Sequence, residues 1–170
     1  MSADVHVRRE GREDVAAIRD VNLAAFDTTA EADLVDALRE QARPVVSLVA
    51  VVGGAIVGHV MFSPVTLPGD GLMLMGLAPM AVRPSHQRQR IGSALVRAGL
   101  DACRDVGAHA VVVLGHPAYY PRFGFSPASR AGLRTEYDVP NEAFMVMELV
   151  SGALGGKTGT VRYHAAFTGV

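Results

Sequence analysis

Residues 83–93 combine basic, polar and small side chains where an apolar strand is expected to give way to an amphipathic helix. Gly92 and Ser93 allow another molecule to approach the backbone closely, and Arg88 and Arg90 bring positive charge. The first N–H groups of a helix have no partner within it and lie at the positive end of its dipole, so such a site favours phosphate. The segment is therefore a candidate phosphate-binding loop. A solvated basic loop or a contact with RNA phosphate is the alternative.

Two adjacent phenols, Tyr119 and Tyr120, follow downstream of this loop. A phenol can donate a proton to a leaving group, so a phosphate-binding loop with a phenol nearby indicates chemistry on a phosphate-bearing cofactor. The other reactive side chains have simpler interpretations. Cys103 is expected in the middle of a helix, and we expect no nucleophile there. The six histidines lack metal-ligand spacing, so we expect no metal site, and His59 is expected in a strand at a sheet surface.

The surrounding elements place both segments in one mixed α/β arrangement. The run 72–82 is apolar throughout, as a strand covered on both faces is. Together with the following loop, helix and strand it forms a βαβ-like unit, which is usually parallel. The expected strands are 5–8, 45–52, 55–67, 72–82, 110–114, 144–150 and 161–167, and the expected helices are 11–26, the segment between Thr29 and Pro44, and 91–106.

Composition limits the functions that this chain can have. Its 170 residues are 49% hydrophobic and 19% charged, which suits a single domain, residues 1–170, with a sizeable core. Sixteen basic and seventeen acidic residues give a net charge of −1, so no overall field favours nucleic acid or an anionic membrane. The apolar stretch 45–62 contains Gly53 and Gly54, which predict a hairpin rather than a membrane span. One cysteine and no secretory signal within 1–8 predict a cytoplasmic protein.

The two candidate segments resemble the acetyl-CoA site of the GNAT superfamily of N-acetyltransferases. That family has Gln/Arg-x-x-Gly-x-Gly/Ala at its pyrophosphate loop, after a strand that ends in Ala-Val-x-Pro. Gln87 and Gly92 match the first and last positions of the loop motif, and Arg90 replaces its first glycine. Downstream, 120–125 resembles the family's Tyr-x-x-x-Gly-Phe, and 114–119 in front of it is most similar to the YhbS-like branch. The resemblance is specific over 72–125.

This resemblance implies a mixed α/β (α+β) fold: a GNAT-like domain with a central, mostly antiparallel sheet, a splayed parallel strand pair and flanking helices. It implies acetyl-CoA as co-substrate, with a backbone N–H near Met80 polarising the thioester carbonyl. A primary amine would attack directly, and Tyr120 would protonate the departing thiolate. The implied cofactor-binding residues are Met80, Ala81, Val82, Gln87, Arg88, Gln89, Arg90, Ile91, Gly92 and Ser93. Arginine at the glycine position costs about 1–2 kcal/mol if its φ is positive, although its guanidinium can pair with a phosphate.

Two roles stay open at this level. The base that accepts the amine proton is His116, which stands near the expected site, or one of Glu148, Asp27 and Glu31, or water. A lone histidine after a strand is, however, more often a structural hydrogen-bond partner. For Tyr120 the alternative is packing under the sheet edge, with Tyr119 expected in the core.

The leading hypothesis is an acetyl-CoA-dependent N-acetyltransferase acting on a primary amine of a small molecule or a peptide. The alternative is a catalytically inactive acyl-CoA-binding or sensing protein of the same fold, for which Arg90 is the only indication. Contact with RNA is disfavoured by the balanced charge, so no nucleic-acid or membrane partner is expected. Asp27, Glu31 and Asp33 would attract a cationic acceptor. The strand 144–150 is either an interior strand or the seam of a homodimer.

Overall fold

A computed structural model describes residues 4–69, 71–168 and 170 of the chain. Its strands are β1 (Val5–Arg9), β2 (Val46–Val52), β3 (Ala55–Val65), β4 (Leu74–Val82), β5 (Ala110–Leu114), β6 (Ser126–Pro127), β7 (Leu133–Thr135), β8 (Phe144–Glu148) and β9 (Gly159–Val161). Its helices are α1 (Val15–Ala25), α2 (Ala30–Gln41) and α3 (Ile91–Asp105). In the described part of the chain, no helix is long and apolar enough to cross a membrane.

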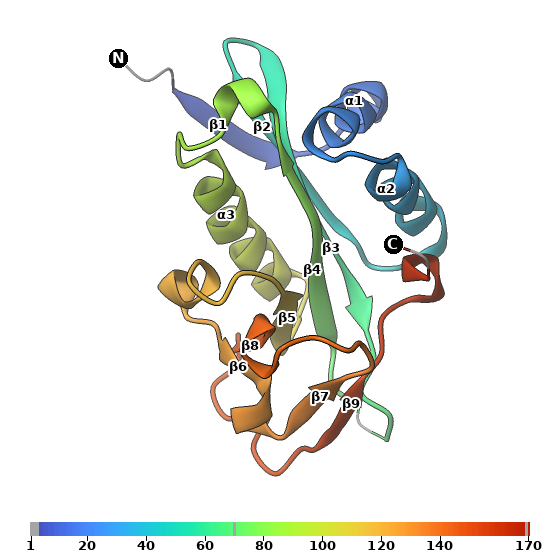
Figure 1. The fold of residues 1–170 in the computed structure, drawn as a ribbon, viewed down its shortest axis with the longest axis vertical. Coiled ribbons are helices and arrows are strands. Elements are labelled where there is room, and N and C mark those ends of the chain that lie inside the picture. The colour runs from blue at the N-terminus through green and yellow to red at the C-terminus, as the bar shows by residue number, and fades with distance from the viewer. Residues whose placement is uncertain (1–3, 70, 169) are drawn as a thin grey trace.

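The main sheet has seven strands in the order β1-β2-β3-β4-β5-β8-β6, and β7 and β9 form a separate parallel pair. Neighbours in the main sheet are antiparallel except β4 and β5, which run parallel because α3 carries the chain from the end of one to the start of the other. Helix α3 covers one face of the sheet, and α1 and α2 cover the other (Figure 1). The predicted mixed α/β fold, mostly antiparallel with one parallel pair, is confirmed.

Both faces of the sheet are buried, which explains why its central strands are mostly apolar on both faces. In β2, Leu48 and Ala50 belong to the core beneath α3, whereas Val49 between them belongs to the core beneath α1 and α2. In β3, Phe62 belongs to the α3 side and Met61 to the other. Successive side chains of a strand point to opposite faces, so a strand covered on both sides needs apolar residues at every position.

A buried polar network connects α1 and α2 to the sheet. His59 of β3 is fully buried; the expectation of a sheet-surface position is wrong because α1 packs over this part of β3. Ser47 Oγ donates to Glu10 and lies 2.9 Å from His59 Nε2, and Asn22 Nδ2 lies 3.3 Å from His59 Nδ1. Since Ser47 gives its only proton to Glu10, its oxygen accepts from Nε2–H, and Nδ1 accepts from Asn22. Arg39 of α2 completes the network by pairing with Glu10 at 2.8 Å.

The predicted elements before β6 match the structure within about two residues at each end, apart from the start of the first helix. The helix expected over 11–26 begins as a tight 3-10 turn, and α1 starts only at Val15. The reason is local: Asp14 Oδ2 accepts a hydrogen bond from Gly11 N at 2.6 Å and from Arg8 Nη1 at 2.6 Å, which fixes a turn ahead of the helix.

The chain after β5 departs most from the expectation. The strand expected over 161–167 is wrong: β9 ends at Val161, and a 3-10 turn over Ala165–Phe167 follows, in which His164 Nδ1 accepts from Ala166 N at 3.0 Å. The short strands β6 and β7 have no apolar pattern that would have predicted them. Strand β8 lies between β5 and β6, so it is an interior strand, the first of the two alternatives that the sequence left open.

Candidate active site

The loop between β4 and α3 is held in a strained conformation. Arg88 and Arg90 both have positive φ, at 65° and 66°. A residue with a side chain loses about 1–2 kcal/mol in this left-handed region, so Arg90 adopts the conformation to which the glycine of the motif is suited. Gln87 helps to hold the loop, since its Nε2 donates to Val82 O at 3.0 Å. Backbone strain of this kind is typical of binding and catalytic sites.

The N-terminus of α3 opens onto a cavity of about 350 Å³. No side chain caps the first turn of this helix, so its backbone N–H groups are available to an anion. A Cβ on Gly92 would lie only 3.2 Å from the Tyr119 hydroxyl oxygen and 3.5 Å from Met80 Cε, so the glycine keeps this approach open. The cavity is lined by Val82, His86, Gln87, Arg88, Arg90, Ile91, Gly92, Ser93, Tyr119 and Arg122.

Seven of the ten residues expected to bind the cofactor line this cavity, and Met80 lines a second cavity described below. The other two line neither of these cavities. Ala81 is buried in the sheet at 2% exposure. Gln89 is exposed, and its side chain lies 3.5 Å from Ser85 O.

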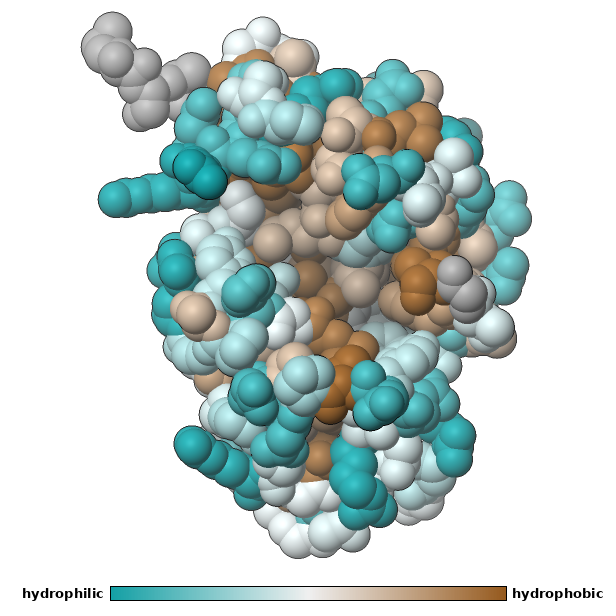
Figure 2. Space-filling model, viewed as in Figure 1, coloured by the Kyte–Doolittle hydropathy of each residue, from teal (hydrophilic) through white to brown (hydrophobic). Residues whose placement is uncertain are grey.

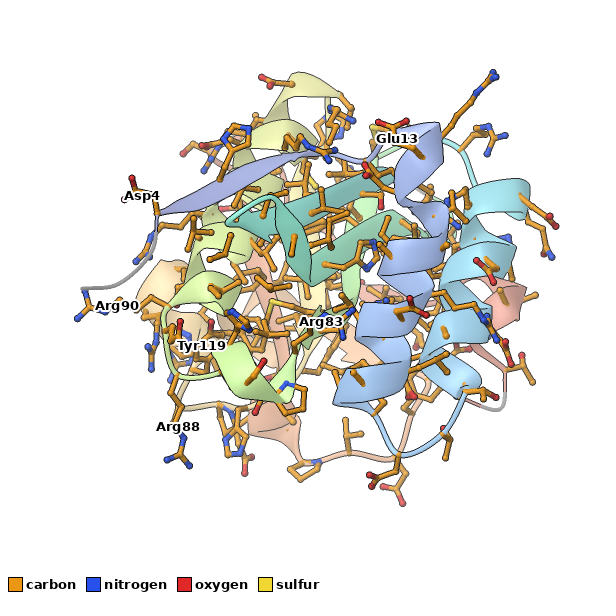
Figure 3. All side chains as sticks on the ribbon, turned by 90° about the horizontal axis from the view of Figure 1, so that it is seen from above. Asp4, Glu13, Arg83, Arg88, Arg90 and Tyr119 are labelled. Carbon is orange, nitrogen blue, oxygen red and sulfur yellow. The ribbon has the colours of Figure 1, made fainter. Side chains whose placement is uncertain are left out.

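Three further residues of this cavity were not expected there: His86, Tyr119 and Arg122. Tyr119 is half-buried rather than in the core, and its hydroxyl lies 3.1 Å from Ser93 Oγ (Figure 3). The Arg122 guanidinium lies 4.5 Å from the centre of the Tyr119 ring and its Nε donates to Tyr119 O at 2.9 Å. With Arg88 and Arg90, whose side chains extend outward from the loop in Figure 3, the cavity has three guanidinium groups. Its geometry and charge suit a phosphate-bearing ligand.

Strands β4 and β5 separate partway along their length. They pair in parallel only over residues 74–76 of β4 and 110–112 of β5, so the rest of β4 has no partner on that side. A bulge accompanies the separation: one residue of β3, Met61, stands opposite two of β4, Ala78 and Pro79. Proline has no N–H to donate to the ladder and is tolerated in a strand at such a bulge.

The register of β4 directs backbone groups that have no partner in β3 into the gap. Arg83 N donates to Val57 O at 2.8 Å, which makes these two residues a hydrogen-bonded pair of the antiparallel ladder with β3. Hydrogen-bonded and non-bonded pairs alternate along such a ladder. The backbone N–H and C=O of Val82 and Met80 therefore point away from β3, toward the side from which β5 has diverged.

The register of β5 has the same consequence on the opposite side of the gap. Gly115 N donates to Ala143 O at 2.9 Å, so the pairs with β8 that are hydrogen-bonded fall at Gly115 and every second residue before it. Leu114 lies between them, and its backbone groups point away from β8 into the gap. The family resemblance implies a splayed strand end at 113–115, which includes Leu114, although Leu114 is not among the ten residues expected to bind the cofactor.

A second cavity, of about 620 Å³, opens at this gap. Figure 2 shows the corresponding hollow on this face, with apolar residues at its floor and hydrophilic side chains around it. Met80 links the two cavities, since it lines the second and its Cε approaches Gly92 in the first. The second cavity is lined by Phe26, Glu31, Leu34, Leu77, Ala78, Pro79, Met80, Leu114, Tyr120, Tyr137, Asp138, Val139, Tyr163, Phe167 and Val170.

Tyr120 forms part of the wall of the second cavity. Its side chain is 9% exposed, and its ring packs edge-on against Phe125 at 5.7 Å. Gly115 makes room for this ring, because a Cβ there would lie 2.4 Å from Tyr120 Cε2. Burial raises the pKa of Tyr120 to about 12, so the phenol stays protonated at neutral pH. In the described part of the protein its hydroxyl makes no hydrogen bond, which leaves it available to a ligand.

The four candidate bases lie in different surroundings in the structure. His116 is exposed in the turn after β5, lines neither cavity, and serves the fold through its carbonyl, which accepts from Tyr119 N at 3.1 Å. Glu148 lies at a different cavity, of about 770 Å³, where its Oε2 accepts from Leu154 N at 2.8 Å. Asp27 is exposed outside both cavities. Glu31 alone among these candidates lines the cavity of Tyr120.

Comparison with known proteins identifies relatives over most of the chain. The model of the acetyltransferase (GNAT) family matches residues 15–125. The N-acetyltransferase YhbS of Escherichia coli K12 is 42% identical over 144 residues, which are 84% of this chain and 86% of YhbS. The E. coli N-acetyltransferase YjhQ is 39% identical over 158 residues, 89% of this chain and 87% of that protein.

Two solved structures of GNAT acetyltransferases are similar to this chain over almost its whole length. The crystal structure of E. coli YhbS in complex with CoA has a TM-score of 0.92 and 38% identity, and the match covers 99% of this chain and 94% of that one. A GNAT acetyltransferase from Brucella melitensis in complex with acetyl-CoA has a TM-score of 0.79 and 35% identity, covering 98% and 99%.

Proposed function

The chain belongs to the GNAT family of N-acetyltransferases, for which acetyl-CoA is the co-substrate, and we propose that it transfers the acetyl group to a primary amine of a small molecule or peptide by direct attack. One observation carries the proposal: the gap between β4 and β5 joins a basic cavity at the start of α3 to a cavity that contains Tyr120. Acetyl-CoA has a diphosphate, then an extended pantetheine arm, then the reacting thioester. The basic cavity, the gap and the cavity that contains Tyr120 would take these three parts in the same order.

The residues at the start of α3 fit the diphosphate of acetyl-CoA. The uncapped N–H groups of the first turn provide donors, and Arg88, Arg90 and Arg122 provide charge. The Tyr119 hydroxyl, beside Ser93, provides one more donor. Met80 and Val82 then offer backbone groups to the pantetheine arm along the open edge of β4.

Two groups near the gap would act on the thioester. The Met80 N–H would donate to the carbonyl oxygen as negative charge develops there, and Tyr120 would give its proton to the sulfur as the carbon–sulfur bond breaks and the carbon–nitrogen bond forms. A pKa of about 12 makes Tyr120 a weak acid. The same burial disfavours a thiolate beside it, so the proton affinity of the leaving group rises as well.

Glu31 is our choice for the base that takes the amine proton, directly or through a water molecule, since it lines the cavity of Tyr120. His116, which the sequence placed near the expected site, is exposed and does not line this cavity. We expect Glu31→Gln to lower kcat by about 10²-fold or more and His116→Gln to leave it near the wild-type value. The reverse result would move the role to His116.

The alternative of an inactive acyl-CoA sensor is not supported. Its only indication was Arg90, and Arg90 adopts the backbone conformation that the loop requires. A cytoplasmic location is part of the proposal, because one buried cysteine suits a reducing compartment.

Calorimetric titration with acetyl-CoA, CoA and ATP tests the cofactor. Micromolar binding of the first two without comparable ATP binding is the expected result, and absence of acetyl-CoA binding would refute the proposal. Thiol release with a panel of amines then tests the reaction.

The two neighbouring tyrosines provide a matched pair of variants. Tyr120→Phe should lower kcat by about 10²-fold or more with acetyl-CoA affinity unchanged. Tyr119→Phe should weaken acetyl-CoA binding by about threefold to tenfold and leave kcat largely intact, since it loses one hydrogen bond at the cofactor. Unchanged turnover in Tyr120→Phe would remove Tyr120 from the mechanism.

A further inference from the structure

The cavity that contains Tyr120 is electrostatically unlike the cavity at α3. Glu31 and Asp138 contribute carboxylates to its lining, and none of its described lining residues is lysine, arginine or histidine. The three guanidinium groups of the site all belong to the other cavity. A ligand in the Tyr120 cavity therefore meets negative charge with no positive charge to offset it.

Neither carboxylate is paired with a cation among the described residues. Glu31 receives one long hydrogen bond, 3.4 Å from Thr28 Oγ1, and Asp138 has no ion pair or hydrogen bond within the described residues. Asp33, in the same helical turn as Glu31, differs because Arg19 pairs with it at 2.9 Å. The free charges of Glu31 and Asp138 thus lie at the cavity while a neighbouring acidic residue is occupied elsewhere.

Aromatic rings form much of the remaining wall. The ring centre of Tyr163 lies 5.6 Å from that of Tyr137 and 5.1 Å from that of Phe167, and Phe26 lines the cavity from the end of α1. Such faces attract cations and pack against flat or aliphatic groups. The Tyr163 hydroxyl is buried and has no hydrogen-bond partner among the described residues, so a polar group that reached it would satisfy it.

From these features we propose that the acceptor is a cationic amine with an aromatic or aliphatic body and no carboxylate or phosphate. The proposal rests on the acetyltransferase function argued above and specifies its acceptor. An amino acid or a phosphorylated amine would bring its own negative charge to Glu31 and Asp138 with no counter-ion nearby. An amine without an acidic group satisfies both carboxylates and uses the aromatic wall.

Two pairs of probes differ only by a carboxylate: tyramine with tyrosine, and cadaverine with lysine. We expect each decarboxylated amine to bind the CoA-saturated protein at least about tenfold more tightly than its partner in calorimetric titration. In the double variant Glu31→Gln, Asp138→Asn this ratio should fall below about threefold. Glu40→Gln, an exposed carboxylate at the other end of α2, is the matched control and should keep the wild-type ratio.

Equal or tighter binding of tyrosine and lysine, an unchanged ratio in the double variant, or no binding of either amine would overturn the acceptor proposal. Turnover assays with the same amines test the acetyltransferase function separately. Acetylation of the carboxylate-bearing amines alone would leave the acetyltransferase assignment intact and refute only the acceptor class. If CoA itself does not bind, the acetyltransferase proposal falls and the acceptor proposal falls with it; if CoA binds and the amine ratios fail, only the acceptor class is refuted.

Discussion

Replacing His59 by glutamine should remove a loss of stability that the wild-type protein suffers as the pH falls from 6.5 toward 4. Burial lowers the pKa of His59 from 6.5 to about 4, so the ring stays neutral in the fold over this range. In the unfolded chain the same ring takes up a proton below pH 6.5. The unfolded state then binds more protons than the folded state, so acid favours unfolding; above pH 6.5 the ring is neutral in both states and its contribution to the pH dependence vanishes.

The structure sets the size of the effect. The interval from pH 6.5 to about 4, at about 1.36 kcal/mol for each pH unit, amounts to about 3 kcal/mol at the acidic end. Protonation in place would also disrupt the network, because Nδ1 accepts a hydrogen bond from Asn22 only while it carries no proton. Glutamine does not titrate, and its amide can donate to Ser47 in place of the ring.

Urea unfolding at several pH values measures how the free energy of unfolding depends on pH. Between about pH 7.5 and 4.5, the free energy of unfolding of the wild type should fall by about 2–3 kcal/mol more than that of His59→Gln. Carboxylates that titrate in both proteins cancel in the comparison. His6→Gln, an exposed substitution on β1, should follow the wild-type curve. The same pH dependence in His59→Gln and the wild type would refute the argument that His59 is kept neutral by burial.

Two glycine substitutions and one arginine substitution test the packing of the core and of the site. Gly99→Ala should destabilise by about 1–3 kcal/mol in urea unfolding, because the new Cβ would lie 2.1 Å from Phe62 Cε1. Gly115→Ala should lower turnover with little change in acetyl-CoA affinity, because its Cβ would displace the Tyr120 ring. Arg90→Gly should relieve about 1 kcal/mol of backbone strain, after allowance for the flexibility of glycine in the unfolded chain, while weakening acetyl-CoA binding in calorimetry by about threefold to tenfold as a guanidinium is lost.

Each of these substitutions has a control or a contrary outcome. Gly71→Ala adds a Cβ into open space and should change stability by less than about 0.5 kcal/mol. A Gly99→Ala protein as stable as the wild type would show that Phe62 can move aside. Full turnover in Gly115→Ala would show that the position of Tyr120 is not critical. Tighter acetyl-CoA binding by Arg90→Gly would mean that the arginine obstructs the cavity.

The sequence was informative where local pattern and local structure coincide. The apolar run 72–82, the break at Arg83 and Pro84, and the helical face from Ile91 predicted β4, the loop and α3 almost to the residue. In the proposed site, the loop would bind the cofactor through its own backbone and the dipole of the helix that follows it, so its chemistry is contained in consecutive residues. For the same reason the resemblance to the GNAT family was specific over 72–125.

Tertiary structure decided which side chains meet across the chain. Tyr119 and Tyr120 are adjacent in the sequence, yet Tyr119 lines the cavity at α3 and Tyr120 lines the cavity at the β4–β5 gap. A 3-10 turn begins at Tyr120, so the two side chains point in different directions. His59 reads as an ordinary strand residue, and only the packing of α1 over β3 buries it. Hydrophobic periodicity reports that a face is covered and does not report what covers it.

The cavity that contains Tyr120 shows this limit most clearly. Glu31 comes from the start of α2, Leu114 from the end of β5, and Tyr137, Tyr163 and Phe167 from a tail that has little regular structure. The sequence by itself determined the fold class, the cofactor loop and the neighbouring phenols, since each depends on contacts between residues close in the chain. The composition of the cavity that contains Tyr120 depends on contacts between distant segments, and such contacts exist only once the whole chain has folded.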